Sequence, residues 1–207
     1  MPSWIHKTTI SDDLLKEIYA SDQDMYPAPL PYERLKGWIE ASPDLSICFE
    51  ATPEEGGDPV PVGAVIVFPL LKKYWDEILV GKLKEPNIDS ATMFPSDAEA
   101  EVGLHVFHVE RFDSTNPSGR LRRFAEFALE DTREIVRRKG WKIVGYSGIS
   151  NSTAASRATS AYFLTLLYSS HGHTDWPSGM QADGLQGYRI RGDLCELRRG
   201  WRCDSAY

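Results

Sequence analysis

The residues best suited to chemistry lie where a buried strand would meet a glycine-containing loop and a basic helix. Segment 102–112 is apolar enough to be buried on both faces, a polar break ends at Gly119, and helical periodicity runs over 119–139. The first N–H groups of a helix have no internal partner and lie at the positive end of its dipole, so they bind anions. Arg120 and Arg122 add positive charge there. The pattern predicts a site for a phosphate-bearing ligand.

The charge distribution favours a small phosphorylated ligand over a nucleic acid. The chain has 23 basic and 30 acidic residues and a net charge of −7. Residues 119–140 carry seven basic and four acidic side chains, a local charge of +3 that leaves −10 for the rest. A protein this acidic is poorly suited to holding a phosphate backbone by bulk charge. The loop also lacks the Gly-Lys-Ser/Thr of a nucleotide P-loop and the spaced glycines of a dinucleotide fingerprint.

Two residues near the end of segment 102–112 are candidates for proton transfer. Side chains alternate along a strand, so Glu110 shares a face with His108 and lies at the carboxyl end of the segment. His105 would point to the opposite face if the strand is regular.

Other chemistries find less support in the residues. His171, His173 and Asp175 have no partner cluster at ligand spacing, so we predict no metal site. No Gly-x-Ser-x-Gly elbow marks a serine hydrolase. The three cysteines lie in no diagnostic context, and we expect them to be reduced thiols.

The elements that would position these residues form one α/β domain over 1–207, without internal repeats. Amphipathic spacing and turn signals predict both helices and strands. The helices are expected over 11–22, 32–41, 70–83, 119–139 and 153–169, and the strands over 45–51, 60–68, 102–112, 141–149, 186–190 and 193–198. Residues 85–98 are polar and contain prolines, which predicts a loop.

This order of elements resembles the GNAT acyltransferase superfamily over nearly the whole chain. The resemblance implies a mixed, mostly antiparallel central sheet flanked by helices, and acetyl-CoA or another acyl-CoA as co-substrate. The family's pyrophosphate loop, Gln/Arg-x-x-Gly-x-Gly/Ala, lies over residues 116–121, where Gly119 matches its first glycine. The residues that would contact the CoA phosphates are Asn116, Ser118, Gly119, Arg120, Leu121 and Arg122.

The resemblance also assigns the remaining contacts to CoA. The pantetheine arm would pair like an extra strand with the backbone of Phe107 and Val109, and Asn151 fits the family's asparagine after the next strand. Residues 168–173 match the family's Tyr-x-x-x-Gly-Phe with His for Phe, so Tyr168 would protonate the leaving thiolate. The spacing from Asn151 leaves Tyr162 as an alternative acid.

The base is the other requirement of acyl transfer to an amine, because the amine arrives protonated at neutral pH. A base has to reach the amine directly or through one water molecule. We rank Glu110 first and His108 second.

The sequence thus predicts an acetyl-CoA-dependent N-acyltransferase that acts on a small amine or metabolite. Two alternatives stay open: a CoA-binding or interaction protein of the same fold without transfer activity, and other small-molecule chemistry in the same cleft. The longest uncharged apolar stretch, 60–71, is too short to span a bilayer, and the first residues form no signal-peptide core. We expect a cytoplasmic protein without nucleic-acid or membrane partners, and leave a homodimer open.

Overall fold

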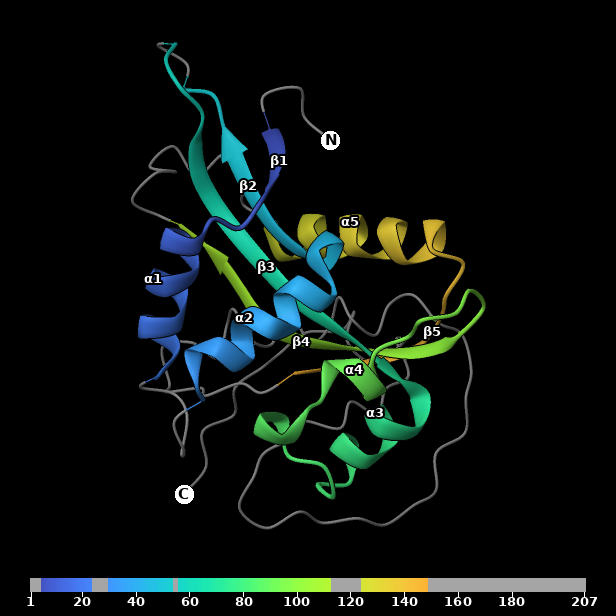
Figure 1. Cartoon of the computed structure of the whole chain (residues 1–207). Helices are drawn as coiled ribbons and strands as arrows, with labels where there is room; N and C mark the ends of the chain where they lie inside the picture. The colour runs from blue at the N-terminus through green and yellow to red at the C-terminus, as the bar shows by residue number, and fades with distance from the viewer. Residues whose placement is uncertain (1–4, 24–29, 54–55, 113–123, 149–207) are drawn as a thin grey trace, which may run out of the picture.

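The centre of the molecule is one twisted five-stranded sheet (Figure 1). The computed structural model describes residues 5–23, 30–53, 56–112 and 124–148. The strands lie side by side in chain order, and each pairs antiparallel with the next except β4 and β5, which are parallel. The sheet is therefore mixed and mostly antiparallel, which confirms the predicted fold class. The strands are β1 Ile5–Thr9, β2 Ser46–Ala51, β3 Val60–Leu71, β4 Glu101–Arg111 and β5 Lys142–Gly148.

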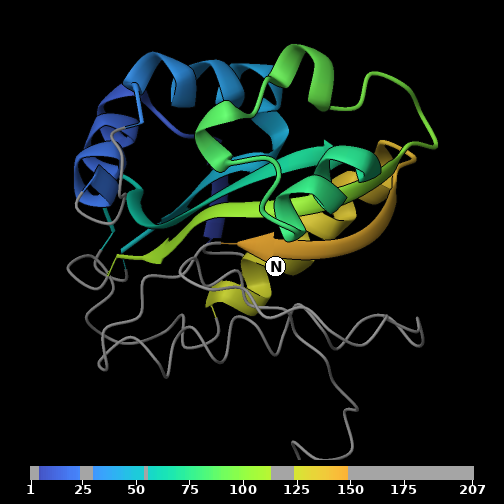
Figure 2. The same cartoon turned by 90° about the horizontal axis from the view of Figure 1, so that it is seen from below.

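Helices cover both faces of the sheet (Figure 2). Among the described residues, α1 to α4 lie on one face and the long helix α5 lies on the other. The α-helices are α1 Asp12–Gln23, α2 Tyr32–Ala41, α3 Lys72–Leu79, α4 Ser90–Met93 and α5 Phe124–Arg138, with 3₁₀ turns η1 Pro43–Leu45 and η2 Glu85–Asn87. No helix in these described ranges is both long and apolar enough to cross a bilayer.

Two hydrophobic clusters hold these layers together, one on each face of the sheet. On one side the apolar stripe of α5, including Phe124 and Leu129, packs against β2, β3 and β4. On the other side Trp38 of α2 and Trp75 of α3 pack against the opposite face of β3 and β4. Burying one large apolar side chain stabilises a fold by roughly 1.5–3 kcal/mol, so these two clusters are the main source of stability.

The structure corrects several predicted boundaries. Strand β1 was not predicted, because only Ile5 of its five residues is buried and an edge strand of this kind shows little alternation. Strand β3 runs to Leu71, so the predicted helix over 70–83 is the shorter α3. The predicted loop over 85–98 contains η2 and α4. The elements predicted beyond residue 148 lie outside the described residues.

Candidate functional site

Strand β4 contains a bulge at its centre. Val106 pairs with Val67 and His108 pairs with Ile66, so Phe107 is an extra residue between two consecutive partners in β3. An extra residue interrupts the alternation of side chains by one position. His105 and His108 therefore lie on the same face of the sheet, the one covered by α1 to α4, where they contact Glu85 and Asp22. The prediction that they lie on opposite faces, made for a regular strand, was wrong.

Three titratable side chains meet beside the bulge, and we call Asp22, His108 and Glu110 the His108 cluster. His108 Nδ1 lies 3.1 Å from Asp22 Oδ2, and His108 Nε2 lies 3.4 Å from Glu110 Oε2. Asp22 and His108 are buried, whereas the Glu110 side chain is 47% exposed. The cluster thus runs from the interior to the surface. It confirms that His108 and Glu110 share a face.

The pKa of His108 is raised to about 9 in this cluster. Burial by itself lowers it, but the hydrogen bond to Asp22 and the neighbouring carboxylate of Glu110 outweigh the cost of desolvation. The imidazole is therefore protonated at neutral pH and cannot accept a proton there. The raised pKa favours Glu110 over His108 as the base near pH 7, and both remain predictions.

The second ring nitrogen of His108 has a proton to donate. Nε2 is buried and makes no hydrogen bond of good geometry with the residues that the structure describes. Its nearest acceptor, Glu110 Oε2, is at 3.4 Å and off the donor direction. A water molecule or ligand atom placed beside both groups would satisfy Nε2–H and contact the carboxylate at once.

The described part of the ladder between β4 and β5 reaches the bulge. Its described pairs run from Glu101 with Lys142 to Val106 with Gly148, whereas β4 itself continues beside β3 to Arg111. The bulge and the His108 cluster therefore meet at residues 106–110.

The structure places only some of the predicted cofactor contacts. The half-buried ring of Phe107 packs against Trp38 and Phe68, and the half-buried Val109 packs on the α5 side. The resemblance implies that these two residues would contact a cofactor through their backbone. The other predicted residues lie outside the described ranges: Asn116, Ser118, Gly119, Arg120, Leu121, Arg122, Asn151, Tyr162 and Tyr168, with His171, His173 and Asp175.

Asp22 is the member of the cluster that sequence reasoning missed. The buried positions Leu15 and Ile18 of α1 are followed by Asp22 at helical spacing, so a carboxylate continues an apolar stripe. A buried carboxylate needs a partner, so this break in the apolar stripe is the signal that could have identified Asp22.

A second buried polar chain links His105 to its neighbours. Trp75 Nε1 donates to Ser147 Oγ at 2.9 Å, and His105 joins Ser147 Oγ at 2.9 Å and Glu85 Oε2 at 2.6 Å. An indole N–H only donates, so Ser147 Oγ accepts from Trp75, and the two ring nitrogens of His105 bridge Ser147 and Glu85. These hydrogen bonds hold the ring of Trp75 over β4 and β5. Together with the His108 cluster it accounts for both histidines of β4.

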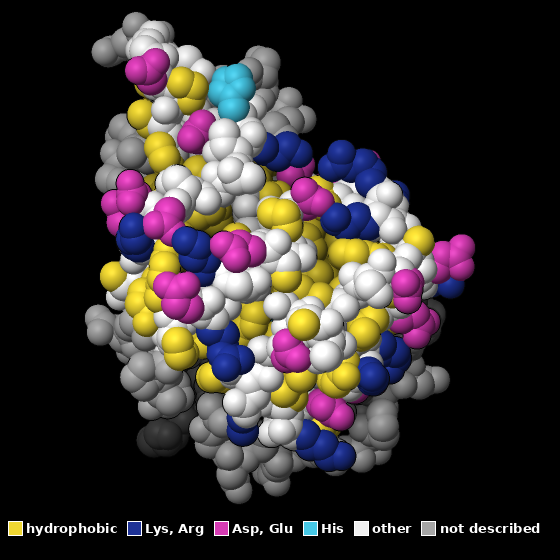
Figure 3. Space-filling model, viewed as in Figure 1, with side chains coloured by type: hydrophobic (Ala, Val, Ile, Leu, Met, Phe, Trp, Pro, Cys, Tyr) yellow, Lys and Arg dark blue, Asp and Glu magenta, His cyan; other side chains and the backbone are white. Residues whose placement is uncertain are grey.

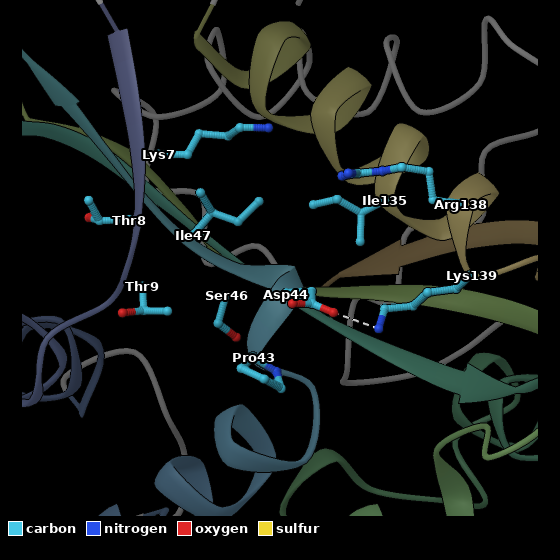
Figure 4. A pocket seen from close by; sticks show the side chains of 10 residues that line it. All are labelled: Lys7, Thr8, Thr9, Pro43, Asp44, Ser46, Ile47, Ile135, Arg138 and Lys139. Carbon is cyan, nitrogen blue, oxygen red and sulfur yellow. Dashed lines mark ion pairs between the residues drawn. The ribbon is translucent and has the colours of Figure 1, made fainter.

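A cavity of about 410 Å³ lies elsewhere, on the α5 side of the sheet between β1, η1 and the end of α5 (Figure 4). Figure 3 shows Lys, Arg, Asp and Glu side chains interspersed over the face drawn there, without one extended basic patch. In the described part of the chain, no group of three or more His, Cys, Asp or Glu forms a metal site.

No protein-family model and no curated protein matches the chain. Solved structures similar to it include an aminoglycoside acetyltransferase and an Arabidopsis protein in complex with acetyl-CoA. An aminoglycoside acetyltransferase from an uncultured soil metagenomic sample, in complex with sisomicin, shares 10% identity, with 86% of this chain and 97% of that chain covered and a TM-score of 0.40. Arabidopsis thaliana NAA60, in complex with acetyl-CoA, shares 14% identity over 76% of this chain and 84% of its own, again with a TM-score of 0.40. Similarity at this level does not identify the function, which has to follow from the chain's own residues.

Proposed function

We propose that the chain is an acyl-CoA-dependent N-acyltransferase, most simply with acetyl-CoA, that acts on a small amine or metabolite. The observation that carries the proposal is the coincidence at residues 106–110. A strand bulge and a cluster of one imidazolium and two carboxylates lie together there. The resemblance to the GNAT superfamily favours the same place for the acyl group.

The reaction would proceed by direct attack on the thioester. The amine nitrogen forms a bond to the carbonyl carbon, the C–S bond breaks, and the amine proton passes to Glu110 directly or through a water molecule. A backbone N–H near the bulge would hold the carbonyl oxygen as negative charge develops on it. The thiolate takes up a proton from Tyr168, as the resemblance implies.

His108 would act as a donor in this scheme. As a buried cation held by Asp22, it would lie beside the carboxylate of the base, with His108 Nε2 3.4 Å from Glu110 Oε2. Its unused Nε2–H could orient the water molecule that carries the proton. We propose that Asp22 is a positioning residue, because it touches His108 and lies on the far side of it from Glu110.

The CoA phosphates would lie at Asn116, Ser118, Gly119, Arg120, Leu121 and Arg122, with Asn151 further along the cofactor. These assignments, the single domain over 1–207 and the cytoplasmic location remain predictions. The rival function is CoA binding without transfer, favoured by Leu121 in place of the second small residue and by His173 in place of the family's phenylalanine.

The deciding experiment measures CoA binding and thiol release separately. Calorimetry with acetyl-CoA should show binding, and Gly119→Val should abolish it, because a side chain there blocks the approach of backbone to phosphate. Release of free CoA with a panel of amines should depend on the amine. Glu110→Gln should lower kcat/KM by about 10²–10⁴-fold. Glu101→Gln, at the exposed opposite end of β4, is the matched control and should change little.

Binding without amine-dependent thiol release across the panel would establish the non-catalytic rival. Unchanged turnover in Glu110→Gln would remove Glu110 from the mechanism. If acetyl-CoA does not bind at all, the proposed function is wrong.

A further inference from the structure

The polar chain around His105 has the connectivity of a catalytic triad. Ser147 Oγ lies 2.9 Å from His105 Nδ1, and Glu85 Oε2 lies 2.6 Å from His105 Nε2. A hydroxyl at one ring nitrogen and a carboxylate at the other let an imidazole take a proton from serine and return it later. Such triads are recognised by the geometry and roles of their groups, and they occur on unrelated folds.

The three side chains come from elements that are far apart in the sequence. Glu85 begins η2, His105 lies in β4, and Ser147 lies in β5 as the direct ladder partner of His105. Directly paired residues point to the same face of a sheet, so the ladder itself brings Ser147 to the imidazole. The turn η2 then places the Glu85 carboxylate at the other ring nitrogen.

Burial decreases along this chain from the acid to the hydroxyl. The side chains of Glu85 and His105 are 3% and 1% exposed, whereas Ser147 is half-buried. A triad needs this order, because a buried acid acts strongly on the imidazole at low dielectric constant and the hydroxyl has to meet the acyl group. Ser147 is thus the member that would touch a substrate.

The carboxylate of Glu85 acts on the imidazole alone. Within the described ranges no lysine or arginine forms an ion pair with it, and its Oε1 is buried without a hydrogen-bond partner. A buried carboxylate with few other donors is stabilised when the imidazole beside it becomes positively charged. Glu85 would therefore favour transfer of the serine proton to His105.

Trp75 supplies a further donor at the hydroxyl. Its Nε1–H donates to Ser147 Oγ at 2.9 Å. With a neutral imidazole whose Nε2–H donates to Glu85, the serine proton is directed to the Nδ1 lone pair. When Oγ attacks a carbonyl group, the oxyanion forms on an atom bonded to the same carbon, within reach of the indole N–H.

We propose that Ser147, His105 and Glu85 form an acyl hydrolase site for activated esters and thioesters. Oγ forms a bond to the acyl carbon and its proton passes to His105 Nδ1. The bond to the leaving oxygen or sulfur breaks, and the leaving group takes the proton from Nδ1. Water then attacks the acyl-serine and gives a proton to Nδ1, and the carboxylic acid leaves as Oγ regains that proton.

The position of Ser147 differs from that in a nucleophile elbow. There the serine stands on a strained turn between a strand and a helix, marked by Gly-x-Ser-x-Gly. Here it lies within β5, so the motif is not expected and the constellation is visible only in the fold. The hydrolysis needs neither CoA nor an amine, which separates it from the proposed transfer reaction.

The test is hydrolysis of p-nitrophenyl acetate by the full chain without CoA or amine. We expect release of p-nitrophenolate above the buffer blank. Ser147→Ala should remove the enzymatic rate, and His105→Gln should lower it by about 10²–10⁴-fold. Glu85→Gln should also lower it. The matched control is Ser46→Ala, because Ser46 is a buried strand serine without a hydrogen-bond partner among the described residues, and the rate should not change.

A covalent label on the unaltered chain keeps the test valid if a variant fails to fold. Diisopropyl fluorophosphate should add to Ser147 and leave Ser46 unlabelled, as mass spectrometry of peptides would show. An unlabelled Ser147 with hydrolysis no faster than the blank would overturn the proposal, as would hydrolysis that a folded Ser147→Ala retains. Both assays omit CoA, so their outcome does not depend on whether the transfer reaction exists.

Discussion

The ionised His108 gives the fold a pH-dependent stability that can be measured. A pKa of about 9, against 6.5 for a free imidazole, corresponds to about 3 kcal/mol of preference for the protonated form in the folded state. The folded-state value is the higher one, so this contribution is complete below pH 6.5 and is lost as the pH rises toward 9.

Removing the carboxylate of Asp22 tests this reasoning. In Asp22→Asn, His108 stays buried but loses its ionic partner, so its pKa should fall. Most of the roughly 3 kcal/mol of stabilisation should therefore be lost at pH 6. At pH 9.5 the unaltered histidine is itself largely neutral, and the variant should be closer to the unaltered protein. The loss of stability should therefore be larger at pH 6 than at pH 9.5.

The assay is urea unfolding at both pH values, with an NMR titration of the imidazole signals. His108→Gln is the control, because it removes the titrating group while other groups that shift over this range remain. The stability difference between the unaltered protein and His108→Gln should shrink between pH 6.5 and 9.5. A difference that does not vary with pH, or an imidazole signal that titrates near pH 6.5, would refute the ion pair.

Other predictions concern packing and reactivity. Gly145→Ala should lower the free energy of unfolding in urea by more than about 1 kcal/mol, because a Cβ there would overlap the ring of Trp75. Gly37→Ala is the comparison and should not destabilise the protein, because a Cβ there meets no other atom. Trp75→Phe should cost about 1 kcal/mol, since it removes the donor to Ser147, and loss of protection of the β5 amides in hydrogen exchange should accompany it. Burial raises the pKa of the Cys48 thiol to about 11, so it should resist iodoacetamide in the folded protein and react after denaturation, as peptide mapping would show.

The sequence predicted the sheet and its layers because strong patterns mark them. The stripe along α5 and the apolar runs of β3 and β4 specify which faces are buried, and the structure confirms them, whereas β5, which was expected to be buried, is only half-buried. The facing of His105 could not be predicted in the same way. Alternation assumes a regular strand, and nothing in the residues of 101–111 marks where an extra residue enters the ladder.

The candidate site was predicted in part for a related reason. Glu110 and His108 stand two residues apart on one strand, so their proximity follows from local geometry. Asp22 lies 86 positions away from His108, and only the packing of α1 on the sheet brings them together. Burial alone would lower the pKa of His108 and keep the imidazole neutral, as a base must be, so the sequence allowed His108 as a base candidate. The contact with Asp22 raises that pKa instead.

The bulge at Phe107 reverses the alternation of side chains along β4. The positions that tolerate polar substitution should therefore alternate differently before and after it. Before the bulge, the even-numbered residues face α5: Val102, Leu104 and Val106. After it, the even-numbered His108 and Glu110 face the layer of α1 to α4, and the odd-numbered Val109 faces α5. A scan of polar substitutions along β4 should therefore show its pattern of tolerated positions shift by one at Phe107. An alignment of this strand with a regular one would need a one-residue gap there, and without the gap it would pair core positions with surface positions along the rest of the strand.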